Sequence, residues 1–448
     1  MTIRGSAVLP RSFRKQYPVA VRGEGPWIWD AEGKRYFDLA GSAAVNFIGH
    51  GERSIAEAMA AQAGSLEFVH SSQFTSQIAE EFAPEVLRFA GPAFEGGRVF
   101  FTCGGSEAVE SALKLARQYQ VEIGQGQRAR FLSRHQAYHG ATLGAMAVSG
   151  NRKRREIYMP LFRDSEKVTT PYCYRCVYGC EDCATKYAGE VETTLEQSGH
   201  DLAAFIFEPV SGATLGAAVP PDGYLQRVAD ACRSKGVLVI ADEVMTGFGR
   251  TGKNFAVQHW NVQPDILIAA KGIASGYAPL GAVIASKRVA DAIDKGSGAL
   301  VHGLTYNAHP ISLAAGRAAF TKIEREALVG AANGEGATGR ALQSELATLR
   351  PCESVGDIRG IGLLWGVEFV ADRATKQAVA PDIQYSSRVA AAAAQRGVMT
   401  YPMQGCVDGI SGDHLLIAPP AISAVDDIHW AIEQLKLAIQ EVERSSRA

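Results

Sequence analysis

Two apolar runs that each end on a charged residue constrain the fold most strongly. Residues 237–241 lead into Asp242, and residues 266–270 lead into Lys271. Apolar runs of this length suit strands that are covered on both faces, as in parallel sheets. Because open parallel sheets bind ligands beyond the carboxyl ends of their strands, we expect Asp242 and Lys271 to face one crevice.

A lysine at such a sheet edge has a specific chemical use. Burial disfavours the charged ammonium, so Lys271 should lose its proton readily and become a nucleophile for a carbonyl carbon. Asp242 would then supply a fixed acid in the same site. The alternative is a structural ion pair at the strand ends, because buried charges are usually paired.

A second site signal lies upstream, where a predicted strand over residues 98–102 leads through a glycine turn into a predicted helix over residues 106–119. Ser106 can cap that helix, and its apolar spacing gives a broad buried face. The paired glycines Gly104 and Gly105 let backbone amides approach an anion at the helix start. The turn therefore predicts a phosphate cradle without the Gly-Lys-Ser/Thr of a nucleotide P-loop, or simply the start of a helix.

Together these three groups match the requirements of pyridoxal phosphate. A lysine can form an imine with its aldehyde, a carboxylate can keep its pyridine nitrogen protonated, and backbone amides can hold its phosphate. Five motifs occur in order along the chain: Gly104-Gly105-Ser106-Glu107-Ala108 with Lys114-Leu115-Ala116-Arg117; Tyr138-His139-Gly140; Glu208-Pro209-Val210; Asp242-Glu243-Val244 through Gly247-Phe248-Gly249-Arg250-Thr251-Gly252 with Lys271-Gly272; and Thr305-Tyr306-Asn307-Ala308-His309-Pro310. From about Trp27 to the C-terminus, the chain resembles the class III pyridoxal-phosphate-dependent aminotransferases of fold type I, in the branch that acts on ω-amines and ω-amino acids.

The resemblance implies a role for each matching residue. Lys271 would bind the cofactor aldehyde and move the proton between substrate and cofactor carbons. Asp242 would pair with the pyridinium nitrogen, and Glu208 would hold the hydrogen-bond network beneath the ring; these three are the predicted catalytic residues. The predicted cofactor-binding residues are Gly105, Ser106, Tyr138, His139, Asp242, Val244 and Lys271, with Thr305 contributed by the partner subunit. The alternatives are loop packing for Tyr138 and His139 and a structural strand-end acid for Glu208.

The resemblance also implies the fold and its assembly. We expect an α/β fold of type I, with a large domain built on a mostly parallel seven-stranded sheet and a smaller α+β domain. The expected divisions are residues 1–50 for an N-terminal segment that packs with the small domain, 51–310 for the large cofactor-binding domain and 311–448 for the small domain. Active sites in this family are shared between two chains, so a homodimer is expected.

Two departures from the family pattern bear on the substrate. Members that act on ornithine, acetylornithine or 4-aminobutyrate carry a second glutamate five residues after the position of Glu208, where this chain has Ala213. A mobile arginine before the Ala-Pro-Pro segment clamps α-carboxylates in other members, but no arginine occurs between Arg396 and Arg444 here. We therefore expect pyruvate rather than 2-oxoglutarate as the amino acceptor. Alternatively, the substrates are amines or amino sugars that carry no carboxylate. The basic cluster at residues 152–155 is either a replacement for the clamp or an ordinary solvated face.

The predicted reaction transfers an amino group from an amine or ω-amino acid to a keto acid, with pyruvate favoured. A racemase, an aminomutase or a decarboxylating transaminase would share the cofactor and differ in which substrate bond lies perpendicular to its ring. A non-catalytic scaffold is a further alternative, against which the presence of Lys271 and Asp242 counts. Aromatic residues that could line a substrate pocket, or equally belong to the core, are Trp27, Phe47, Tyr174 and Trp260.

A run of four cysteines is not explained by this reaction. Cys173, Cys176, Cys180 and Cys183 form two C-x-x-C pairs separated by three residues. Such pairs suit tetrahedral zinc, yet the interval is shorter than zinc sites usually have. A structural zinc, two disulfides and a plain interface loop all stay open, and a metal here would take no part in transamination.

Composition argues against several classes of partner. The 448 residues carry a formal net charge of −2 and their basic residues form no stripe, which disfavours nucleic acids and anionic membranes. No apolar segment follows Met1, and no run reaches the length of a membrane span. A cytoplasmic enzyme is therefore expected.

Overall fold

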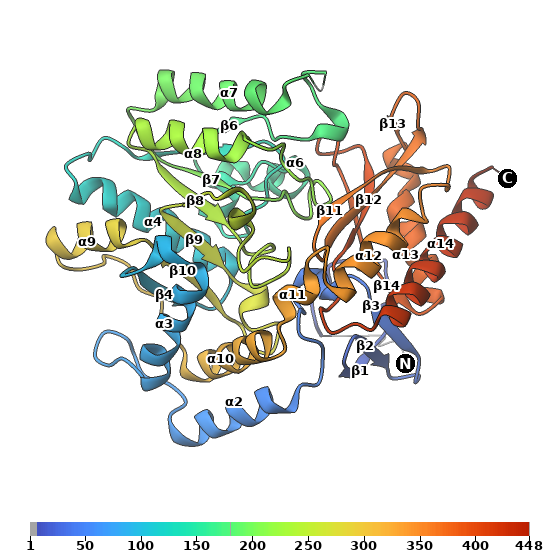
Figure 1. The fold of residues 1–448 in the computed structure, drawn as a ribbon, viewed down its shortest axis with the longest axis horizontal. Coiled ribbons are helices and arrows are strands. Elements are labelled where there is room, and N and C mark those ends of the chain that lie inside the picture. Colours follow the sequence, from blue (N-terminus) through green and yellow to red (C-terminus); the bar gives the residue numbers. More distant parts are fainter. Residues whose placement is uncertain (1–6, 180, 448) are drawn as a thin grey trace.

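The computed structural model describes residues 7–179 and 181–447, and its central element is a seven-stranded sheet (Figure 1). Across the sheet, the strands lie in the order β4 (Arg98–Thr102), β10 (Gly281–Ala285), β9 (Ile266–Ala269), β8 (Leu238–Asp242), β7 (Leu202–Phe207), β5 (Arg130–Arg134) and β6 (Glu166–Val168). Neighbouring strands from β9 to β6 are parallel, and β10 runs against both of its neighbours. The predicted α/β fold with a mostly parallel seven-stranded sheet is confirmed.

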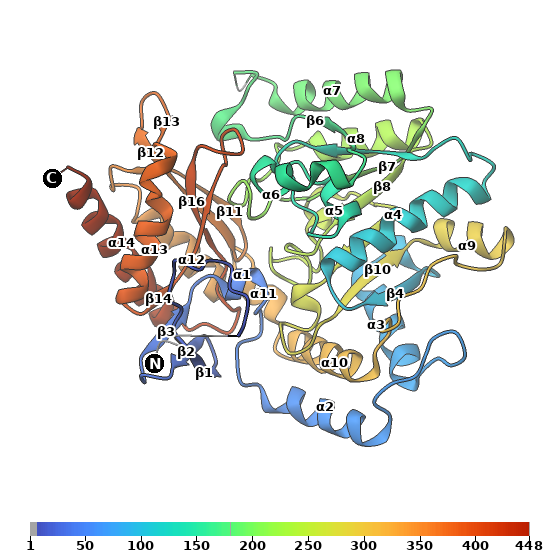
Figure 2. The same cartoon turned by 180° about the vertical axis from the view of Figure 1, so that it is seen from behind.

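Helices cover both faces of this sheet, which explains the unbroken apolar runs in its central strands. Successive residues of a strand point to opposite faces. Ile240 and Ile268 belong to one apolar cluster, which includes α4 (Gly105–Glu122) and α9 (Lys287–Lys295). Val239 and Leu267 belong to another, which includes α7 (Cys183–Ser198), α8 (Tyr224–Ser234), α3 (Gln77–Ala90) and α10 (Pro310–Arg325). Figure 2 shows α4 and α9 on the face that is turned away in Figure 1, and α10 packs against α2 (Arg53–Ser65).

A second lobe is built on an antiparallel sheet in the C-terminal part of the chain. Its strands lie in the order β11 (Val355–Ile361), β12 (Leu364–Asp372), β16 (Asp413–Ile417) and β15 (Tyr401–Gln404), and β13 (Gln377–Ala378) pairs with β12. The helices of this lobe, which pack on one another, are α12 (Ala337–Ala347), α13 (Tyr385–Gln395) and α14 (Val425–Arg447).

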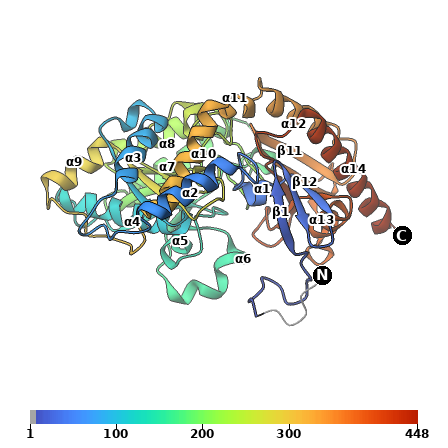
Figure 3. The ribbon, with the colours of Figure 1, turned by 90° about the horizontal axis from the view of Figure 1, so that it is seen from below.

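The N-terminal strands join this second lobe. β1 (Ala20–Glu24), β2 (Trp27–Asp30) and β3 (Arg35–Asp38) form an antiparallel meander, and β3 pairs in parallel with β14 (Val398–Met399). The rings of Trp27 and Trp430 lie 5.4 Å apart, which packs β2 against α14. Figure 3 shows these strands beside the C-terminal helices, far from the outer edge of the seven-stranded sheet.

Arg250, in the loop that follows β8, connects the two lobes. Its buried guanidinium donates hydrogen bonds to the carbonyl oxygens of Asn46 at 2.8 Å, Ala418 at 3.0 Å and Pro419 at 2.6 Å. Its own carbonyl oxygen accepts a hydrogen bond from the amide of Leu363 at 2.9 Å. The loop between β8 and β9 is therefore anchored to the N-terminal segment and to the C-terminal lobe.

Shorter elements complete the path of the chain. The remaining α-helices are α1 (Gly41–Ala44), α5 (Leu143–Val148), α6 (Arg152–Arg155) and α11 (Leu328–Ala332). The 3-10 helices are η1 (Pro92–Phe94), η2 (Glu156–Leu161), η3 (Cys173–Arg175), η4 (Ala256–Trp260), η5 (Lys271–Ile273) and η6 (Pro381–Ile383). Within residues 7–179 and 181–447, no helix combines the length and apolar character needed to cross a bilayer.

Candidate active site

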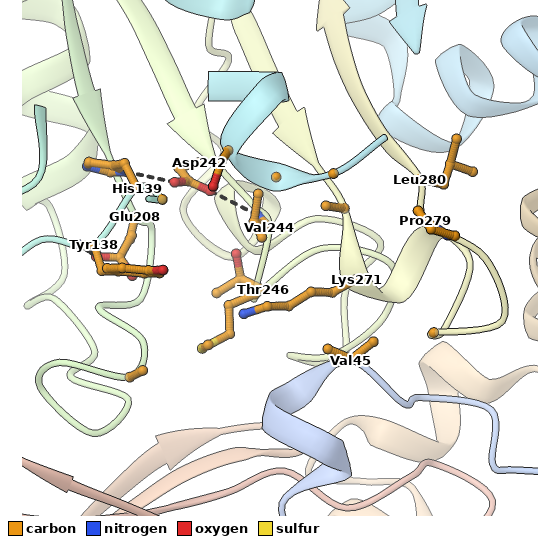
Figure 4. A pocket seen from close by; sticks show the side chains of 18 of the residues that line it. Val45, Tyr138, His139, Glu208, Asp242, Val244, Thr246, Lys271, Pro279 and Leu280 are labelled. Atoms are coloured by element: carbon orange, nitrogen blue, oxygen red, sulfur yellow. Dashed lines mark hydrogen bonds and ion pairs between the residues drawn. The ribbon is translucent and has the colours of Figure 1, made fainter. Parts of the chain in front are cut away.

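A cavity of about 440 Å³ opens in the loops that follow β4, β5, β7, β8 and β9 (Figure 4). This is the carboxyl edge of the parallel strands, where ligands of such sheets bind. The predicted site residues that line it are Gly105, Ser106, Tyr138, His139, Glu208, Asp242, Val244 and Lys271. Thr305 does not line the cavity of its own chain, because it lies exposed in the segment before α10.

Lys271 begins η5 with a φ of +48°, a backbone conformation that is costly for a residue other than glycine. Its side chain points across the cavity towards the wall that carries Tyr138 and Glu208 (Figure 4). Burial lowers the pKa of its amine to about 8, partly opposed by the carboxylates of Asp242 and Glu208. No hydrogen bond or ion pair holds its Nζ among the described residues, so the structural ion pair with Asp242 is absent there.

Asp242 is held in place by two hydrogen bonds at the end of β8. Nδ1 of His139 donates to Oδ2 at 2.6 Å, and the amide of Val244 donates to Oδ1 at 3.0 Å. Both side chains of the His139–Asp242 pair are almost completely buried. Two donors on this buried carboxylate fix its direction into the cavity.

Glu208 stands at the end of β7, next to Asp242. Its Oε2 accepts a hydrogen bond from the amide of Tyr138 at 3.1 Å, and its Oε1 accepts one from the amide of Gly212 at 3.0 Å. Burial raises the pKa of this carboxyl group, and the nearby charge of Asp242 acts in the same direction. Glu208 therefore ties the loop that carries Tyr138 to the loop after β7.

The first turn of α4 forms the opposite end of the cavity. The helix begins at Gly105 with Gly104 as N-cap, so the prediction that Ser106 caps it is wrong. The Ser106 hydroxyl instead accepts a hydrogen bond from the amide of Ala141 at 3.0 Å, which ties the helix start to the loop after Tyr138. A side chain at Gly105 would place its Cβ 3.1 Å from Val244, so glycine permits this close approach. The amide groups of a helix start favour an anion at this end.

The chemistry of these groups fits pyridoxal phosphate. The cavity offers an amine without a partner among the described residues, a buried carboxylate fixed by His139, and a helix start suited to a phosphate. Val244 and Tyr138 both line the space between them and could contact a planar ring.

Cys173, Cys176 and Cys183, the described members of the four-cysteine run, do not line this cavity. Cys173 begins η3 and Cys183 begins α7, with the Sγ atoms of Cys176 and Cys183 3.1 Å apart. Cys180, the other predicted ligand, lies outside the described residues. No group of three or more side chains suited to a metal occurs in the part of the chain that the structure describes, so the zinc hypothesis has no support there.

Several lining residues escaped the sequence patterns. Val45 comes from the N-terminal segment, in which no motif marks it, whereas Thr246 lies inside the loop motif after β8 and could have been found from it. The cavity is lined by none of the candidate aromatic residues Trp27, Phe47, Tyr174 and Trp260, which favours the alternative that they belong to the core. Their apolar surface serves packing instead, as with the contact between Trp27 and Trp430.

Comparison with known proteins agrees with this geometry. The family model "Aminotransferase class-III" matches residues 10–439. The chain is 36% identical over 442 residues to the uncharacterized aminotransferase YodT of Bacillus subtilis, covering 98% of this chain and 99% of that protein. It is 34% identical to an adenosylmethionine-8-amino-7-oxononanoate aminotransferase of Geobacter sulfurreducens, over 95% of this chain and 92% of that protein.

Solved structures give the same result. A thermostable (S)-enantioselective ω-transaminase from Thermomicrobium roseum superposes with a TM-score of 0.89 at 36% identity, covering 98% of this chain and 96% of that one. A PLP-bound amine transaminase from an uncultivated Pseudomonas species superposes with a TM-score of 0.89 at 34% identity, covering 98% of this chain and 97% of that one.

Proposed function

The chain belongs to the class III aminotransferases, and from this premise we propose that it is a pyridoxal-phosphate-dependent transaminase that moves an amino group from an amine or ω-amino acid to pyruvate. The observation that carries the proposal is the Lys271 amine, which reaches into the cavity that also contains the Asp242 carboxylate fixed by His139. Amino transfer with this cofactor needs both groups.

The cavity residues divide the work of holding the cofactor. When bound, pyridoxal phosphate supplies an aldehyde carbon that takes up the amino group and a ring that accepts electrons. Lys271 would hold that aldehyde, Asp242 the ring nitrogen, and the amides of Gly105 and Ser106 the phosphate.

Lys271 is also the group placed to move protons. With a pKa of about 8, its Nζ exists in both the neutral and the charged form near neutral pH, so it can accept a proton from the substrate carbon and return it. Asp242 is held in place by His139, where it would face the ring nitrogen. Glu208 keeps Tyr138 in place through the backbone amide of that residue.

Two features support pyruvate as the acceptor. Ala213 lines the cavity at the position where relatives that use ornithine or 4-aminobutyrate carry a glutamate. The stretch before Ala418 lacks the arginine that clamps an α-carboxylate in other members of the family, which counts against 2-oxoglutarate as the acceptor.

A homodimer with shared sites is part of this proposal. Thr305 is exposed, and it would reach the phosphate only in the site of the partner subunit. Sedimentation of an active protein at the mass of a single chain would contradict this arrangement.

The visible spectrum of the purified holoenzyme tests the reaction. Amines and amino acids are added one at a time, and a true donor should bleach the cofactor band, which pyruvate should then restore. Release of carbon dioxide or racemisation without pyruvate consumption would refute the proposal in favour of another reaction of the same cofactor. A protein with no band after addition of pyridoxal phosphate would refute the cofactor assignment itself.

A further inference from the structure

Among the described residues, Arg154 is the one arginine of the basic cluster at residues 152–155 whose charge no carboxylate balances. In α6 and the residues around it, Arg152 pairs with Glu156 and Arg155 pairs with Asp164. Lys153 donates to Oε1 of Gln404 at 3.1 Å, and Arg154 contacts the Sδ atom of Met403 at 3.3 Å. A thioether is a weak acceptor, so the Arg154 guanidinium keeps most of its hydrogen-bonding capacity. Among the described residues, no ion pair involves Arg154.

Arg154 is also the member of the cluster that contacts a residue of the candidate active site, while it does not itself line the cavity. Its guanidinium carbon lies 4.5 Å from the centre of the Tyr138 ring, and Tyr138 lines the cavity. Its contact with Met403 of β15 puts it between the two lobes, where Figure 2 shows α6 beside the C-terminal sheet. Its charge is felt inside the cavity, because it contributes to the lowered pKa of Lys271.

Other arginines near the cavity are already engaged. Arg359 forms ion pairs with Asp357 and Glu368, each within 3 Å. Arg250 is surrounded by backbone carbonyl oxygens at the junction of the lobes. Binding a substrate carboxylate at either residue would first require those contacts to break.

We infer that Arg154 binds the carboxylate of the 2-oxo acid acceptor. The inference rests on the proposed function, and it names the residue that replaces the missing C-terminal arginine. A guanidinium offers two parallel donors to a carboxylate, and stacking on the Tyr138 ring restricts its plane before the substrate arrives. Binding would exchange the weak contact with Met403 for charge-assisted hydrogen bonds.

The test compares Arg154→Gln with the matched control Arg152→Gln, which removes a neighbouring exposed charge outside the cavity. Each holoenzyme is assayed with pyruvate and with acetaldehyde, which is pyruvate with hydrogen in place of the carboxylate. Loss of a charge-assisted pair should raise the KM for pyruvate by about 10- to 100-fold in Arg154→Gln. The KM for acetaldehyde, and both values in Arg152→Gln, should stay within about twofold of the unmodified enzyme. Arg154→Lys keeps the positive charge but loses the two parallel donors of the guanidinium, so its KM for pyruvate should lie between those of the unmodified enzyme and Arg154→Gln.

If the KM values of Arg154→Gln for pyruvate and for acetaldehyde rise by the same factor, Arg154 only positions Tyr138. That result overturns the inference. Binding of propionate, an unreactive carboxylate, gives a readout that does not depend on turnover. Titration calorimetry should show weaker propionate binding in Arg154→Gln by a similar factor, and unchanged binding in Arg152→Gln. If no amine donor reacts but this difference in propionate binding holds, the proposed transamination fails while the role of Arg154 stands. Unchanged propionate binding in Arg154→Gln refutes the role of Arg154, whatever the activity.

Discussion

The pKa of Lys271 allows a direct test on the protein without its cofactor. The perturbation is a change of pH across the range in which the amine loses its proton. An ordinary lysine has a pKa of 10.5, whereas burial lowers that of Lys271 to about 8. At pH 7, about a tenth of the Lys271 amine would then be neutral, roughly 300-fold more than for an ordinary lysine.

Competitive labelling with acetic anhydride measures this difference, because only the neutral amine reacts. Cofactor-free protein is labelled between about pH 6 and pH 10, and the acetylated peptides are quantified by mass spectrometry. Lys295, whose side chain is 76% exposed, is the internal control. Labelling of Lys271 should rise with pH and reach half of its maximum near pH 8, while labelling of Lys295 should still be rising at the top of the range. The pH at half-maximal labelling decides the result rather than the total amount of label, because burial can also slow access of the reagent to the amine.

A Lys271 profile that runs parallel to that of Lys295 would refute the reasoning, because it would mean that water solvates the amine as fully as at the surface. The stability of the cofactor-free protein gives a second check on the sign. The pKa of Lys271 is lower in the folded protein than in the unfolded chain, so the buried ammonium opposes folding below about pH 8. This loss of folding free energy is relieved as the pH rises from about 8 towards 10.5.

Three substitutions test other parts of the site. His139→Ala removes the donor 2.6 Å from Asp242 and should lower kcat by about 10- to 100-fold in steady-state assays; an unchanged kcat would mean that Asp242 needs no support. Gly105→Ala forces a Cβ to 3.1 Å from Val244 and should weaken pyridoxal phosphate binding by about tenfold in an absorbance titration, unless the backbone shifts freely. Arg250→Ala strips the donors from buried carbonyl oxygens and should lower the free energy of unfolding by about 3–5 kcal/mol in urea, with a loss below about 1 kcal/mol arguing against a buried junction.

The strand-end residues were predictable because their signal is local. Asp242 and Lys271 each follow an apolar run that must be a buried strand, and parallel strands bring such ends to one edge. Glu208, which follows β7, was instead predicted from the resemblance of Glu208-Pro209-Val210 to the family motif. The strand order itself, with β10 inserted antiparallel between β4 and β9, does not follow from any local pattern.

Residues that depend on tertiary contacts were harder to predict. Ser106 matched a helix cap by its residue type, but its hydroxyl is engaged by the amide of Ala141 from a distant loop. Val45 reaches the cavity because the N-terminal segment crosses between the lobes, and Arg154 differs from Arg152 and Arg155 in having no acidic partner among the described residues. The sequence alone indicates neither the place of Val45 nor the missing partner of Arg154, because both depend on which side chains meet after folding.

Arg250 links the contacts between the two lobes to the pKa of Lys271. Its guanidinium is balanced mainly by the partial charges of carbonyl oxygens from separate chain segments, and its positive field contributes to the lowered pKa of Lys271. Any movement of the C-terminal lobe that draws Ala418 and Pro419 away would leave that charge less neutralised and would press the nearby amine further towards its neutral form. The position of one lobe relative to the other would thus contribute to the proton affinity of Lys271, which burial mainly determines.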